Sequence, residues 1–205
     1  MRKVLLVSLI LCLFLTKTTA QTKSAISIVP SWNNSASMFQ DTFIGKTNSK
    51  GKLGLGIGVD YSKMLGESFY LSGMLSMQMR GYKGSANVRA LYYDIPLTIN
   101  LAFGKHKYWT VGTGVYGGMC LAGSYKSPFG WTRIKLGESL NDSRSRLDHG
   151  LVFQFGASQF SYFGRIYMLA YVGTDNIIPN DRQIKGQALK LRTMAFHWAI
   201  PISTK

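Results

Sequence analysis

The stretch 89–104, RALYYDIPLTINLAFG, constrains the fold more than any other part of the chain. Large apolar residues occupy every second position on one face of it: Leu91, Tyr93, Ile95, Leu97, Ile99, Leu101 and Phe103. The other face is mixed and carries Asp94 and Asn100. A period of two indicates a β-strand and excludes a helix. The alternation outruns an ordinary strand of about 5–6 residues and suits a tilted strand of about 9–11 residues that crosses a bilayer.

Similar alternation recurs along the chain between glycine-containing and polar breaks. It predicts strands at 24–30 (short and weak), 52–63, 69–80, 89–104, 108–123, 150–159, 165–174 and 189–202. The connections between them alternate long and short, and the long ones are 31–50, 81–88, 124–148 and 175–187. Small outer-membrane barrels have short periplasmic turns and long outer loops. We therefore expect an all-β fold, an eight-stranded antiparallel up-and-down transmembrane β-barrel.

The first twenty residues have the pattern of a secretory signal peptide. Arg2 and Lys3 form a basic start, 4–15 an apolar core, and Thr18-Thr19-Ala20 a small-residue cleavage site. This assignment leaves 21–205 as one barrel domain, exported to the bacterial outer membrane. No other long apolar run follows, which excludes a helical membrane protein.

The chain is strongly basic. It has 24 Lys and Arg against 9 Asp and Glu, and removing Arg2, Lys3 and Lys17 leaves 21 against 9, or about +12. Such a balance indicates an anionic partner, and export disfavours nucleic acid, which leaves anionic lipid or polysaccharide. Five basic residues share the predicted 124–148 loop: Lys126, Arg133, Lys135, Arg144 and Arg146. We expect this rim to contact phosphates of lipopolysaccharide or an acidic surface glycan.

Charged residues also fall on the predicted inward face of the barrel: Asp60, Arg80, Asp94 and Arg165. Buried charges must be paired or solvated. An eight-stranded barrel has room only for side chains or one small ligand. We therefore expect a structural polar network that plugs the lumen, with an ion path as the alternative. Pro96 removes a ladder hydrogen bond, and we expect a local bulge there.

Two motifs have ordinary explanations. The segment 112–117, GTGVYG, matches the dinucleotide-binding pattern G-x-G-x-x-G, but no helix is predicted after it. We expect these glycines to face inward and make room for tyrosines of neighbouring strands. Cys120 is the single cysteine after residue 20, so we expect a packed side chain and no disulfide.

Catalytic and metal-binding patterns are weak. The histidines are dispersed along the chain, at His106, His149 and His197, so we expect no metal site and no cofactor. His149 beside Asp148, with Ser143 and Ser145 nearby, is the only catalytic candidate. Adjacency in sequence does not create a triad, and we expect no enzyme activity.

A family resemblance supports the barrel. The segment 92–101, YYDIPLTINL, follows a glycine-containing stretch at 81–85 and precedes 108–118, YWTVGTGVYGG. Together with the hairpin 61–71, YSKMLGESFYL, it resembles the PorT-like outer-membrane β-barrel proteins of Bacteroidetes. The resemblance covers about the middle half of the chain after residue 20. It implies an eight-stranded barrel and says little about activity.

Three functional hypotheses follow. The leading one is a porin-like outer-membrane barrel with a plugged interior that has a structural, adhesive or assembly-associated role through its outer loops. The first alternative is an outer-membrane enzyme that modifies lipid. The second is a secreted soluble β-barrel that binds a small apolar ligand, which requires an apolar lumen and a polar outside.

Overall fold

The computed structural model contains ten β-strands and describes residues 24–41, 45–83, 87–104, 107–137, 145–157, 164–174, 176–177 and 188–204. The strands are β1 (Ser24–Asp41), β2 (Gly45–Asn48), β3 (Lys50–Met64), β4 (Phe69–Lys83), β5 (Asn87–Phe103), β6 (Trp109–Ser127), β7 (Gly130–Arg133), β8 (Leu147–Ala157), β9 (Arg165–Gly173) and β10 (Ala188–Thr204). Among the described residues no helix is long and apolar enough to cross a membrane. The predicted signal peptide lies outside the described residues.

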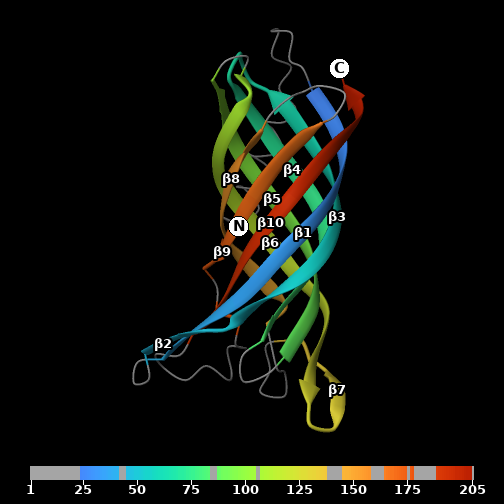
Figure 1. The fold of residues 1–205 in the computed structure, drawn as a ribbon, viewed down its shortest axis with the longest axis vertical. Coiled ribbons are helices and arrows are strands. Elements are labelled where there is room, and N and C mark those ends of the chain that lie inside the picture. The colour runs from blue at the N-terminus through green and yellow to red at the C-terminus, as the bar shows by residue number, and fades with distance from the viewer. Residues whose placement is uncertain are drawn as a thin grey trace, which may run out of the picture.

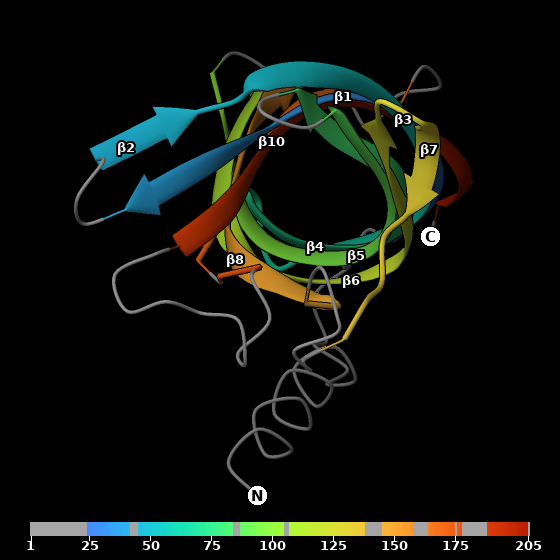
Figure 2. The same ribbon diagram turned by 90° about the horizontal axis from the view of Figure 1, so that it is seen from below.

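Eight of the strands close into a barrel. Their order around the wall is β1, β3, β4, β5, β6, β8, β9 and β10, with every neighbouring pair antiparallel. The first and last strands pair from Ala25↔Thr204 to Gln40↔Ala188, which completes the ring seen along the axis in Figure 2. The remaining strands extend the wall, since β2 pairs with β1 and β7 with β6. The predicted eight-stranded up-and-down barrel is confirmed.

The two ends of the barrel differ (Figure 1). At the turn end, β1 begins, β10 ends, and β3–β4, β5–β6 and β8–β9 are joined. At the loop end, β2 and the β6–β7 hairpin extend beyond the ring. The chain therefore concentrates its extra structure at one end of the wall.

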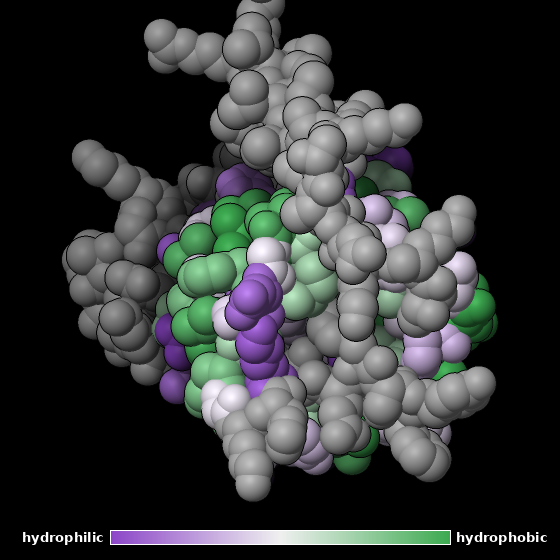
Figure 3. Space-filling model, turned by 90° about the horizontal axis from the view of Figure 1, so that it is seen from above, coloured by the Kyte–Doolittle hydropathy of each residue, from purple (hydrophilic) through white to green (hydrophobic). Residues whose placement is uncertain are grey.

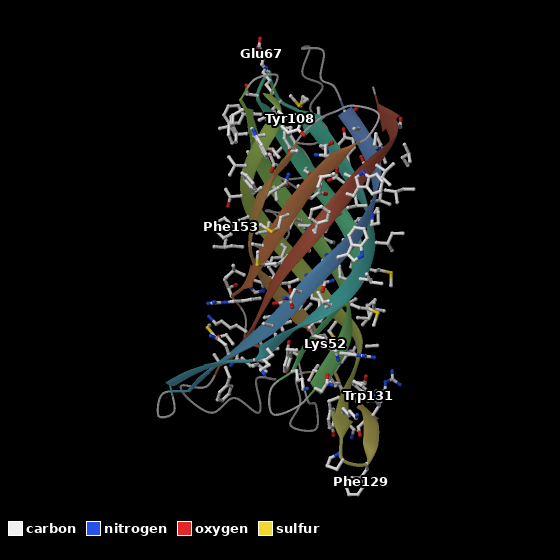
Figure 4. All side chains as sticks on the ribbon, viewed as in Figure 1. Lys52, Glu67, Tyr108, Phe129, Trp131 and Phe153 are labelled. Atoms are coloured by element: carbon white, nitrogen blue, oxygen red, sulfur yellow. The ribbon has the colours of Figure 1, made fainter. Side chains whose placement is uncertain are left out.

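The wall is apolar outside, and its inward face carries buried polar and charged side chains together with buried apolar ones. In β5 the residues from Leu91 to Phe103 at odd positions face outward, and Asp94, Thr98 and Asn100 are buried inside. Outward side chains on other strands follow the same rule, as Phe153 does in the middle of the wall (Figure 4). Viewed onto the turn end, green hydrophobic residues flank a narrow strip of purple hydrophilic ones (Figure 3). This arrangement is the reverse of a soluble barrel that holds an apolar ligand.

Several strands are longer at the loop end than their sequence indicates. β1 continues through the predicted 31–50 loop to Asp41, and β6 continues to Ser127. The predicted long loop at 81–88 is also wrong, because β4 ends at Lys83 and β5 begins at Asn87. In the continuation of β6 both faces carry polar residues, and in that of β1 Asn34 interrupts the outward apolar phase of Trp32 and Met38, so the alternation weakens while backbone pairing continues.

Pro96 does not produce the predicted bulge. Pro96 pairs with Tyr116, and the β5–β6 register does not change there. The register shift between these two strands lies nearer the loop end, between Leu91 and Tyr92. On the β4 side, bridge pairs are absent between Gly73↔Leu97 and Ser76↔Asp94. The missing N–H of Pro96 is therefore accommodated by a short gap in the β4–β5 ladder, and the register of the two strands is the same on both sides of the gap.

Glycines in β6 admit polar side chains from β5, and not the predicted tyrosines. A Cβ on Gly112 would lie 1.9 Å from Asn100 Oδ1, and one on Gly118 would lie 2.6 Å from Asp94 Oδ1. Because β6 is a single strand from Trp109 to Ser127, the 112–117 segment also lacks the helix that a dinucleotide site needs.

We expect the closed ring to resist unfolding by SDS at room temperature, because its ladders leave no open edge in the eight-stranded wall. Folded protein in detergent should migrate differently on a gel before and after boiling. An identical migration of heated and unheated samples that are folded by circular dichroism would contradict this expectation.

Candidate functional site

The four predicted lumen residues are all buried on the inward face, and they form two clusters. Asp60, Arg80, Asp94 and Arg165 are each at most 3% exposed. The structure pairs Arg165 with Asp60 and Arg80 with Asp94. Each guanidinium therefore reaches a carboxylate from another strand of the wall.

The Arg165 cluster joins β9 to β3 and β4. Arg165 Nη2 donates to Asp60 Oδ2, and the Ser72 hydroxyl donates to Asp60 Oδ1. The rings of Tyr70 and Tyr167 lie 5.4 and 5.7 Å from the guanidinium carbon. The ion pair is thus enclosed by aromatic faces, which attract a cation by their quadrupole.

The Arg80 cluster joins β4 to β5 and β8. Arg80 Nη2 donates to Asp94 Oδ2 at 2.8 Å, and Nη1 donates to Asp148 Oδ2 at 3.4 Å. The Tyr116 hydroxyl lies 3.2 Å from both oxygens of Asp148. The Tyr171 ring lies 4.9 Å from the Arg80 guanidinium carbon. One arginine therefore serves two carboxylates that come from different strands.

Asp148 is the main lumen residue that the sequence reasoning missed. We expected it at the base of a loop, whereas β8 starts at Leu147 and places Asp148 inside the barrel. The signal was present, because Asp148 continues the inward phase of Gly150, Val152 and Gln154. Nothing in the sequence distinguished Tyr116, the hydrogen-bond partner of Asp148, from the other tyrosines, because the contact depends on the pairing of β6 with β8.

Uncharged polar residues connect the walls between the clusters. Gln154 Nε2 donates to the Tyr70 hydroxyl at 3.0 Å, and the Thr98 hydroxyl donates to Gln154 Oε1 at 3.3 Å. The Tyr70 hydroxyl also lies 2.9 Å from Thr110 Oγ1. The largest lumen side chains, among them Tyr70, Tyr92 and Tyr171, are fully buried. The inward side chains named here are buried and are hydrogen-bonded to one another across the walls, and a ring of eight strands leaves room for little more than such side chains or one small ligand.

The weak catalytic and metal patterns remain dispersed in the structure. Asp148 points inward and His149 outward, because neighbouring residues of a strand face opposite sides. Ser145 Oγ lies 3.5 Å from the backbone oxygen of Leu147, while Ser143 and His106 lie outside the described residues. His197 is buried and stacks on Tyr167 at 5.2 Å. Within the described part of the chain no three potential metal ligands gather.

The predicted basic rim lies around the β6–β7 hairpin at the loop end. Lys126, Arg133, Lys135 and Arg146 are exposed there, and Arg144 lies outside the described residues. The segment after β7 is tied to the wall, since Ile134 N donates to Gly123 O at 2.8 Å and Cys120 N donates to Arg146 O at 2.7 Å. Arg146 Nε donates to Leu136 O at 3.3 Å. These hydrogen bonds therefore hold the backbone next to Arg133, Lys135 and Arg146 against the end of the wall.

No known family and no curated protein matches the chain in sequence. Solved structures that resemble it in shape include Ail, the attachment invasion locus protein of Yersinia pestis, which is 12% identical over 88% of this chain and 98% of its own, with a TM-score of 0.44. Neisserial surface protein A is 9% identical over 84% and 97% of the two chains, with a TM-score of 0.40. The outer membrane protein OprG from Pseudomonas aeruginosa is 10% identical over 85% and 94%, with a TM-score of 0.35. The likeness is distant, and no function of these proteins is carried over.

We expect Arg165→Met to destabilise the barrel by about 3–5 kcal/mol, because it leaves the Asp60 carboxylate buried without its cation. The double variant Asp60→Asn with Arg165→Met removes both charges and should recover much of that loss. Urea unfolding in lipid vesicles, followed by tryptophan fluorescence, measures both. Equal stability of the single and double variants would show that the pair is not coupled.

Proposed function

We propose that the protein is an outer-membrane β-barrel with a plugged interior that acts through its loop end. The observation that carries this proposal is the reversed polarity of the closed wall. Outward residues such as Leu55 and Ile99 are at least 56% exposed, while charged residues lie inside. A wall of this kind is stable in lipid, where apolar side chains face the acyl chains and every backbone group is paired.

We infer that the loop end faces the outside and the turn end the periplasm. Short turns on the periplasmic side and longer outer connections are the rule in such barrels. Aromatic residues near the turn end mark the level of one membrane interface, since the Tyr108 and Trp109 rings lie 5.4 Å apart and Trp109 stacks on Phe155 at 6.0 Å. Aromatic rings of this kind prefer the membrane–water interface.

The role that fits best is structural, adhesive or assembly-associated and not enzymatic. The opposite directions of Asp148 and His149 support the absence of a catalytic dyad. The resemblance of 92–101 and its flanks to PorT-like barrels of Bacteroidetes supports membership of that family. The ligand that we propose for the basic rim is an acidic polysaccharide, including the glycan part of lipopolysaccharide.

The rim is tested by replacing Arg133, Lys135, Arg144 and Arg146 with glutamine. We expect weaker binding to an anionic polysaccharide at low salt, because several exposed contacts of about 0.2–1 kcal/mol each act together. Added salt should weaken wild-type binding in the same way, since charges are screened within about 8 Å at physiological ionic strength. If the variant kept the affinity and the salt dependence of the wild type, the proposal that the rim binds an anionic polysaccharide would be refuted.

The plugged interior is tested in planar bilayers. We expect the wild-type protein to show no large, steady ion conductance, because Tyr70, Tyr92 and Tyr171 are fully buried across the lumen. Cell fractionation provides the companion test of location. A large steady conductance would overturn the plug, and recovery of the protein in the soluble fraction without detergent would overturn the outer-membrane assignment.

A further inference from the structure

A second cationic cluster lies on the outer wall at the loop end, and the sequence reasoning did not single it out. It is centred on Trp131 of β7, which is labelled with Lys52 in Figure 4. The Lys52 ammonium lies 5.4 Å from the Trp131 ring centroid, and the Arg89 guanidinium carbon lies 5.1 Å from it. β3, β5 and β7 thus bring two cations to one indole.

Strand pairing places further cations beside these residues. Asn87 pairs with Lys83 in one ladder and with Lys126 in the other, and Lys126 pairs with Trp131. Lys52 Nζ donates to Asn87 Oδ1 at 2.6 Å. The Lys52 stem passes over Gly81, where an added Cβ would lie 3.0 Å from Lys52 Cδ. We call Lys52, Lys83, Arg89 and Trp131 the wall cluster.

The described carboxylates lie away from the wall cluster. Asp60, Asp94 and Asp148 are buried in the lumen, and Glu67 lies at the turn end with Lys107. Among the side chains that the structure describes, the wall cluster has no acidic partner. Lys83 and Arg89 instead repel the Lys52 ammonium. A bound anion would relieve this repulsion, because it attracts all three cations at once.

The surroundings of the cluster distinguish a lipid from a soluble ligand. Arg89 and Trp131 are on the outside of the wall. Toward the turn end the apolar surface begins next to them in the strands, at Leu53, which is 84% exposed and follows Lys52, and at Met79, which lies two residues before the Gly81 that pairs with Arg89. A molecule that fills both surfaces needs an anionic head and acyl chains. The wall at this level would face the headgroups of the outer leaflet, which rests on the orientation given in the proposed function.

We propose that the wall cluster binds the phosphate group of an outer-leaflet lipid, with its acyl chains lying along the wall beside Leu53. The Arg89 guanidinium offers a fork of N–H donors that matches phosphate oxygens, and the Lys52 ammonium adds a second charge. Trp131 holds both cations by its ring face and is an amphipathic side chain suited to the headgroup level.

The test is a titration of folded protein in nonionic detergent micelles with bisphosphorylated lipid A, followed by native mass spectrometry. The variant Lys52→Gln with Arg89→Gln should bind about tenfold more weakly, whereas Arg89→Lys, which keeps the charge but loses the fork, should lose less. Lys63→Gln with Lys107→Gln makes the same charge change at the turn end and should bind as wild type does. The heat-dependent gel shift confirms that each variant is folded.

Two further arms identify the ligand. Dephosphorylated lipid A should bind wild type and double variant equally, and inorganic pyrophosphate should compete only weakly with lipid A. Tight competition by pyrophosphate would replace the lipid by a soluble phosphate and overturn the proposal. The proposal would also be overturned if the double variant bound lipid A as tightly as the wild type or the turn-end control does.

The outcome is separable from that of the proposed function. The wall variant should still bind anionic polysaccharide, and the rim variant should still bind lipid A. If wild-type protein fractionates with the outer membrane and binds polysaccharide while the wall variant keeps its lipid A affinity, only the wall site fails. If the wild type does not enter the outer membrane, the proposed function itself fails, and the wall site with it.

Discussion

The pairing of β1 with β10 is the constraint on which the rest of the structure depends. These strands come from opposite ends of the described chain, and their ladder runs from Ala25↔Thr204 to Gln40↔Ala188. Once it forms, the wall has no edge, and each residue is assigned to the inside or the outside by its position in a strand. Closure around eight strands also fixes a narrow interior, so the side chains that face inward must fill it and satisfy one another.

The interior solves this problem with buried ion pairs that lie among tyrosines and apolar side chains such as Val152 and Leu169. Arg80 reaches Asp94 and Asp148, and Arg165 reaches Asp60, so that the ion pairs tie different strands of the wall together. Buried ion pairs contribute little net stability, because desolvation offsets much of their attraction. Their geometric demands are strict, however, and a slip of one residue would expose these charges to the outside of the wall. We infer that they specify register more than they add stability.

The period of two was enough to predict the barrel, its strand number and the inward phase of Asp60, Arg80, Asp94 and Arg165. It could not predict which charges meet, because Arg80 and Asp148 are joined only through the order of strands around the ring. It also failed where strands leave the apolar band. In residues 31–41 Asn34 interrupts the outward apolar phase of Trp32 and Met38, and residues 124–127 show no alternation of hydropathy, yet β1 and β6 continue through them by backbone pairing. For the same reason Lys52, Arg89 and Trp131, which are far apart in sequence, gave no sign of proximity.

The continuation of paired strands past the ring changes what the loop end can do. A cation on a disordered loop loses conformational freedom when it binds, and this loss weakens the complex. Arg133 and Trp131 belong to β7, which is held to β6 by four residue pairs from Ser124↔Arg133 to Ser127↔Gly130. Much of their backbone entropy is therefore already lost in the free protein. A surface of this kind can discriminate between ligands by the spacing of their charges, because its own charges cannot rearrange freely to suit each one.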